Sequence, residues 1–106
     1  MNLSDLIFGK RKDPVSLAIE EAINHMEAGD HAAAIAAIRD KALPLAPDHR
    51  RARLHLGIAL MLKGDLGEAE KELSAVAGPD RRWSDSEGAA ALVALDRIVS
   101  LRAGGK

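Results

Sequence analysis

The sequence predicts an all-α fold, and three observations support that prediction. Alanine is the commonest residue, with 20 copies among 106 residues, and it is the strongest helix former of all residue types. Aromatic residues, which favour strands, number only two, Phe8 and Trp83. Apolar residues recur at three- and four-residue spacings, and Asp, Gly and Pro stand between the periodic segments. A chain of this length suits one small domain.

Five helices are expected, at about residues 14–28, 31–43, 49–63, 66–77 and 85–102. Asp13, Asp30 and Asp48 stand where N-caps of the first three helices would be, because an aspartate before a helix can accept bonds from its first free N–H groups. The last two helices begin with the spacing of a capping box, Asp65 with Glu68 and Ser84 with Glu87.

Three parts of the chain differ in composition. Residues 1–12 are expected to form an amphipathic and basic segment, residues 13–103 a single helical domain, and residues 104–106 a flexible tail. The first segment carries the apolar residues Leu3, Leu6, Ile7 and Phe8, followed by the basic run Lys10, Arg11 and Lys12. A signal peptide has its basic residues before the apolar ones, and no apolar run is long enough to span a membrane. We therefore expect a cytoplasmic protein.

The chain contains an internal repeat, which is the most informative feature of the sequence. A shift of 35 residues aligns residues of the same kind: Ile19 with Leu54, Ala22 with Gly57, Ile23 with Ile58, Met26 with Met61, Gly29 with Gly64, Asp30 with Asp65, Ala34 with Ala69 and Ile38 with Leu73. Periods of this length are typical of helical repeat proteins. The sequence therefore predicts two tandem antiparallel helical hairpins of one design.

At these positions the chain resembles the tetratricopeptide repeat family, whose period is 34 residues with two helices per repeat. The resemblance rests on the pair Leu56-Gly57, the turn Gly64-Asp65, the small residue Ala69 and Pro47 near the end of a repeat. It covers about residues 14–78. The large aromatic residues of the family are missing here.

The resemblance also implies how the helices pack. Close approach within a hairpin requires small residues, so Ala22 is expected to face Ala34, and Gly57 to face Ala69. The fifth helix takes the place of a third repeat's first helix and is expected to act as a C-terminal cap, because each repeat buries its face on a neighbour. A plain five-helix bundle is the alternative architecture.

In this family the first helix of each hairpin lines a concave groove. The resemblance implies a groove lined by Ile19, Ile23, Met26, Leu54, Ile58, Met61 and Leu62. Such a lining is more apolar than a solvated surface, and exposed apolar patches mark interaction sites. The predicted function is therefore that of a protein–protein interaction module, an adaptor or scaffold that binds a peptide or helix of another protein.

Two alternatives remain open at this stage. The groove is either open or filled from within, by the last helix or by Leu3, Leu6, Ile7 and Phe8 of the same chain or of a second copy. Residues 3–12 also combine apolar and basic side chains, which suits a homo-oligomeric structural protein or a peripheral membrane adaptor.

No residue pattern in the chain indicates catalysis, a cofactor or a metal. There is no cysteine, and the four histidines, His25, His31, His49 and His55, lack the spacing of a metal site. No serine belongs to a nucleophile motif, and no glycine-rich phosphate loop is present. A net charge of −1 and the lack of aromatic platforms do not favour nucleic acid, despite the basic cluster Arg50, Arg51, Arg53, Arg81 and Arg82.

Overall fold

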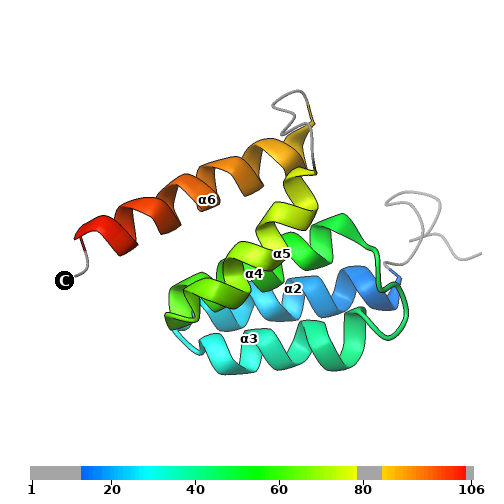
Figure 1. The fold of residues 1–106 in the computed structure, drawn as a ribbon. Helices are drawn as coiled ribbons and strands as arrows, with labels where there is room; N and C mark the ends of the chain where they lie inside the picture. Colours follow the sequence, from blue (N-terminus) through cyan, green and yellow to red (C-terminus); the bar gives the residue numbers. More distant parts are fainter. Residues whose placement is uncertain (1–12, 79–84, 105–106) are drawn as a thin grey trace, which may run out of the picture.

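The computed structural model describes residues 13–78 and 85–104, and every regular element in these two ranges is helical. The elements are α2 (Pro14–Glu27), α3 (His31–Ala37), the π-helical turn η1 (Ile38–Ala42), α4 (Arg50–Lys63), α5 (Leu66–Ala77) and α6 (Ser86–Gly104). Figure 1 shows them as a stack of helices with α6 at one end. The predicted all-α fold with five main helices is confirmed.

The helices form two antiparallel hairpins and one further helix. In the first hairpin α2 packs against α3 and η1, and in the second α4 packs against α5. The second hairpin stacks on the first through contacts of α4 with α2 and α3, and α6 packs on α5 and α4 (Figure 1). Helix α6 therefore packs on both helices of the second hairpin, just as α4 packs on both helices of the first. This arrangement confirms the tandem hairpins with a C-terminal helix.

The core between the helices is built largely from alanine. Half of the buried apolar residues are alanines, and the largest side chains with almost no exposed surface include Ile19, Ile38, Leu56, Leu60 and Leu73. Small side chains allow helix axes to approach closely, so that the aromatic residues of the family are not needed to fill the space. No polar or charged residue is buried within the part of the chain that the structure describes.

A π-helical turn continues α3. The N–H of Leu43 donates to the carbonyl oxygen of Ile38 at 2.9 Å, five residues back. Such a turn encloses one more residue than an α-helical turn. The repeat of this chain is 35 residues long, one more than the family period of 34. The wider π-helical turn can hold that additional residue. Ile38 and Ala42, at the two ends of the turn, both have no exposed surface.

The first two helix starts agree with the predicted N-caps. The Asp13 carboxylate accepts a hydrogen bond from Ser16 N at 2.8 Å, and the Asp30 carboxylate accepts one from Ala33 N at 3.1 Å. Gly29, which follows the first helix, has the positive φ of 84° that a glycine adopts easily.

The caps predicted for α4 and α6 were assigned to the wrong residues. His49, not Asp48, caps α4, because its Nδ1 accepts a hydrogen bond from Ala52 N at 3.2 Å. Asp85 caps α6, accepting from Gly88 N at 2.6 Å, and the predicted Ser84 lies outside the described residues. Both caps stand one residue later than predicted, because adjacent polar residues compete for the position and the backbone decides between them.

The predicted capping box of α5 is also wrong. Asp65 stands at the N-cap, but its side chain makes no capping hydrogen bond and pairs with Lys63 at 3.2 Å instead. Glu68 lies 2.6 Å from Arg39, across the interface between the hairpins. A cation two residues away has therefore taken the Asp65 carboxylate, and a cation 29 residues away has taken that of Glu68.

Gly57 does make a close contact, but with a different residue from the one predicted. A Cβ atom built on Gly57 would lie 2.6 Å from Cγ and 2.7 Å from Cδ2 of Leu73, and the next atom belongs to Glu72 rather than to Ala69. In an antiparallel hairpin with a short turn, a residue early in one helix faces a residue late in the other. Residue 57 therefore opposes Leu73, four residues beyond Ala69.

Candidate functional site

The predicted groove residues divide into core residues and surface residues. Ile19 has no exposed surface and Leu54 is 6% exposed, so both belong to the core that joins α2 to α4. Ile23, Met26, Ile58 and Met61 are half-buried and pack against that core. Leu62 is 49% exposed. Five of the seven residues therefore remain available at the surface.

A further apolar residue belongs with these five. Applying the 35-residue shift to Ile58 leads to Val93 in α6, which is 60% exposed. The repeat could have revealed Val93 in the sequence, but treating the fifth helix as a cap removed it from consideration. Ile23, Ile58 and Val93 thus stand at one position of three successive helices, α2, α4 and α6.

These three helices present one common surface. Helix α4 packs against α2 on one side and against α6 on the other, and Figure 1 shows the three in succession. Residues three and four positions apart share a face of a helix, which adds Met26, Met61 and Leu62 to the row. We call this surface the three-helix face, and it consists of Ile23, Met26, Ile58, Met61, Leu62 and Val93.

Charged residues flank the three-helix face at both ends. Glu27 follows Ile23 by four residues, and Arg97 follows Val93 by four, so each lies on the same side of its helix as the apolar residue. Both charged residues are exposed, as is Asp96 beside Arg97. The middle helix has Leu62 at the corresponding position. An apolar centre with a polar rim is the usual composition of a protein-binding surface.

His55 adds a neutral side chain to the face, three residues before Ile58. Burial lowers the pKa of the half-buried His55, and the nearby Arg51 guanidinium lowers it further, because both disfavour the imidazolium form. The side chain is therefore predominantly uncharged near neutral pH. It therefore adds a neutral side chain to the face instead of a second cation beside Arg51.

Two arginines of the basic cluster have structural partners. Arg50 bonds to Asp85 at 3.0 Å and to the Val76 carbonyl oxygen at 2.5 Å, while Arg53 bonds to Glu72 at 2.7 Å and to the Pro47 carbonyl oxygen at 2.6 Å. These contacts hold neighbouring elements together. The other predicted members Arg81 and Arg82 lie outside the described residues.

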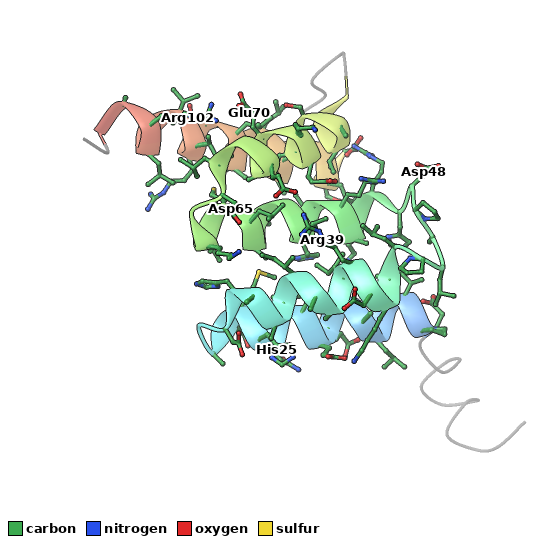
Figure 2. All side chains as sticks on the ribbon, turned by 60° about the horizontal axis from the view of Figure 1, so that its bottom comes forward. His25, Arg39, Asp48, Asp65, Glu70 and Arg102 are labelled. Carbon is green, nitrogen blue, oxygen red and sulfur yellow. The ribbon has the colours of Figure 1, made fainter. Side chains whose placement is uncertain are left out.

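Arg102 and Glu70, which lie side by side in Figure 2, form an ion pair at 2.8 Å between α6 and α5. His25 lies 3.6 Å from Glu21. Within residues 13–78 and 85–104, no three or more His, Asp or Glu side chains come together as metal ligands would. The same part of the chain contains no helix long and apolar enough to cross a membrane. Leu3, Leu6, Ile7 and Phe8 lie outside the described residues.

Comparison with known proteins identifies the repeat. The family model described as a tetratricopeptide repeat matches residues 19–87, which run from the second turn of α2 to the start of α6. No curated protein and no solved structure matches the chain. The matched region is more than half of the chain and coincides with the stacked hairpins of the structure. The chain therefore belongs to the tetratricopeptide repeat family, whose domains bind other proteins.

Proposed function

We propose that this chain is an adaptor or scaffold that binds an amphipathic helix or peptide segment of another protein on the three-helix face. One observation supports the proposal most strongly. Helices α2, α4 and α6 carry an apolar side chain at the same repeat position, and on the face that they form Val93 and Leu62 are 60% and 49% exposed. Contiguous exposed apolar residues with a polar rim are typical of binding surfaces.

The spacing of the three helices favours a helical ligand that lies across them. Helices in direct contact have axes about 8–10 Å apart. Two turns of a bound helix advance by about 11 Å. Apolar residues seven positions apart on such a ligand would then meet Ile23, Ile58 and Val93 in turn. Met26 and Met61 can adapt their shape to the residues between them.

The experiment first identifies the partner and then measures its affinity. A photoreactive amino acid at Leu62 in the full chain captures neighbours in the native host, and the same group at Val99, which is 64% exposed on α6, supplies the background. A protein captured only from Leu62 is then purified. Its affinity is measured for the original chain and for the variants Ile58→Glu, Val93→Glu and Val99→Glu.

We expect Ile58→Glu and Val93→Glu to raise Kd by about tenfold or more, because each places a charge in the desolvated centre of the contact. Val99→Glu introduces the same charge outside the three-helix face and should leave Kd unchanged. Circular dichroism of all three variants checks that the helices remain. Equal affinities for all three folded variants would refute the proposal.

A further inference from the structure

A second apolar surface lies at the opposite edge of α2. Leu17 is 54% exposed and Leu45 is 62% exposed. Leu17 precedes Ile23 by six residues, which places the two side chains about 120° apart around the helix. The three-helix face therefore does not include Leu17. Two large apolar side chains with more than half of their surface exposed need a separate explanation.

The register of the first hairpin indicates where these two leucines lie relative to each other. Lys41 Nζ bonds to both carboxylate oxygens of Glu21, at 2.9 and 3.0 Å, and so pairs residue 41 with residue 21. In an antiparallel pair, four residues forward on one side correspond to four residues back on the other. Leu45, three residues past the end of η1, therefore lies near the level of Leu17 along α2. The bond from Leu45 N to the Ala42 carbonyl oxygen, at 3.1 Å, continues the coiled backbone up to that point.

This patch, Leu17 with Leu45, lies directly beside the point where the described chain begins. Leu17 N donates to the Asp13 carbonyl oxygen at 3.0 Å, so the patch is one helical turn from Asp13. The patch also belongs to the first hairpin, for which the described residues 13–78 and 85–104 supply a stacked neighbour only on the side of α4. Repeats of this kind require their outer face to be covered or polar.

The sequence just before Asp13 has the composition that would cover the patch. It contains Leu6, Ile7 and Phe8 in succession, and the five residues from Phe8 to Asp13 can span up to about 17 Å. The basic run Lys10–Lys12 lies between them and the helix. Asp48, three residues after Leu45, is exposed and has no ion pair within the described residues. An acidic residue beside the patch complements these cations.

We propose that Leu6, Ile7 and Phe8 dock in cis on Leu17 and Leu45 and cover the N-terminal edge of the stack. The segment would then act as an N-terminal cap, as α6 does at the other end. It would leave the three-helix face free for another protein. This inference does not depend on the proposed function, because it concerns a different surface.

Cysteine cross-linking in the full chain tests the position of the segment. The sequence has no cysteine, so each pair of introduced cysteines is unique. The pair Phe8→Cys with Leu45→Cys reports docking on the patch. The pair Phe8→Cys with Leu62→Cys forms a disulfide if the segment docks on the three-helix face. The pair Phe8→Cys with Asn24→Cys, at an exposed position, measures how fast a disulfide forms when the segment is not docked.

We expect the Leu45 pair to form an intrachain disulfide at least about tenfold faster than either control pair. Adding Leu6→Ser and Ile7→Ser should remove that advantage, because the apolar contact holds the segment in place. Equal rates for the Leu45 and Asn24 pairs would refute docking. A faster Leu62 pair would place the segment on the three-helix face, and disulfide-linked dimers would show docking in trans; either result overturns the proposal.

A thermodynamic cycle gives an independent test. One variant carries Ile7→Ser and Phe8→Ser, a second carries Leu17→Ser and Leu45→Ser, and a third combines all four changes. If the two sets of residues touch, the combined variant should lose no more melting temperature than the more affected of the two double variants. Losses that add up would mean that the segment and the patch act independently, which contradicts the proposal.

Discussion

At the scale of single residues, Gly57 leaves no room for a side chain in the second hairpin. A methyl group at this position would lie 2.6 Å from the Leu73 side chain. Leu73 is fully buried, so neighbouring atoms hinder its side chain from moving away. The helix itself would favour alanine over glycine by about 1 kcal/mol. The packing cost of an overfilled contact is about 1–3 kcal/mol, so the steric effect should dominate.

We therefore predict that Gly57→Ala lowers the free energy of unfolding by about 1 kcal/mol. Gly67 is the matched control, because it lies in α5 with no atom within 4 Å of an added Cβ. Gly67→Ala should raise the free energy of unfolding by about 0.5–1 kcal/mol. Urea unfolding of both variants measures the two signs. A stabilising Gly57→Ala would show that Leu73 can move away without cost.

His55 predicts how stability depends on pH. Its pKa in the folded chain is lowered below the ordinary value of 6.5, which applies to the unfolded chain. At a pH between these two pKa values the unfolded chain therefore binds more protons than the folded chain. Stability contributed by this group is therefore fully present above about pH 6.5 and is lost as the pH falls through the folded-state pKa.

The matched variant is His55→Gln, which cannot titrate. Relative to this variant, the original chain should lose stability as the pH is lowered from 7 towards 5. Thermal unfolding at several pH values measures the difference, and contributions from the other histidines cancel in the comparison. A difference that does not change with pH would mean that the imidazole is as well solvated in the folded chain as in the unfolded one.

The caps show which local features the sequence could predict. Asp13 and Asp30 were both assigned correctly, although Asp30, like Asp48, is followed directly by a histidine. Where two candidates are adjacent, as with Asp48 and His49, propensity alone does not decide between them. Asp65 and Glu68 were lost to Lys63 and Arg39, and the partner Arg39 is 29 residues away from Glu68. Long-range ion pairs of this kind have no signal in a local pattern.

At the scale of elements, Asp85 connects α6 to the second hairpin. Its carboxylate caps α6 through Gly88 N at 2.6 Å, and its other oxygen accepts from Arg50 at 3.0 Å. Arg50 also binds the Val76 carbonyl oxygen near the end of α5. One carboxylate thus starts α6 and fixes that start against α4 and α5.

Two substitutions separate these roles. Asp85→Asn keeps a good N-cap and removes the charge, so it should cost about 0.5–1 kcal/mol, the value of a partly exposed ion pair. Asp85→Ala removes both interactions and should cost about 1–3 kcal/mol. Chemical unfolding of the two variants gives the difference. Equal losses would mean that the cap contributes nothing and that the ion pair alone holds the start of α6.

The surface residues of the helices were harder to predict than the helices themselves. The helical period and the 35-residue shift located all five helices within a few residues. The same reasoning placed Ile19 in the groove, although it has no exposed surface, and overlooked the exposed Val93. Periodicity defines which residues share a side of a helix. How much of that side the neighbouring helices cover depends on their packing, which the sequence pattern does not contain.

At the scale of the whole molecule, the part of the stack that the structure describes is nearly one-dimensional, because α6 contacts the second hairpin and not the first. Among the described elements, α4 contacts the first hairpin on one side and α6 on the other, whereas the first hairpin and α6 each pack only against the second hairpin. Opening of α6 leaves the first hairpin intact but exposes one side of the second. Local stability should therefore be highest in α4 and decrease towards both ends.

Hydrogen exchange on the full chain measures this gradient, and Leu95→Ala changes it in a predictable direction. Leu95 is 7% exposed in α6, and its truncation should cost about 2–5 kcal/mol of the packing between α6 and the second hairpin. Exchange should accelerate most in α6, less in α5 and least in α2, because the loss is transmitted only through contacts between neighbours. Val99→Ala, at a position that is 64% exposed, should leave all rates nearly unchanged. Equal acceleration in α2 and α6 would show instead that the chain unfolds as one cooperative unit, in which case the three-helix face would be either wholly formed or wholly absent.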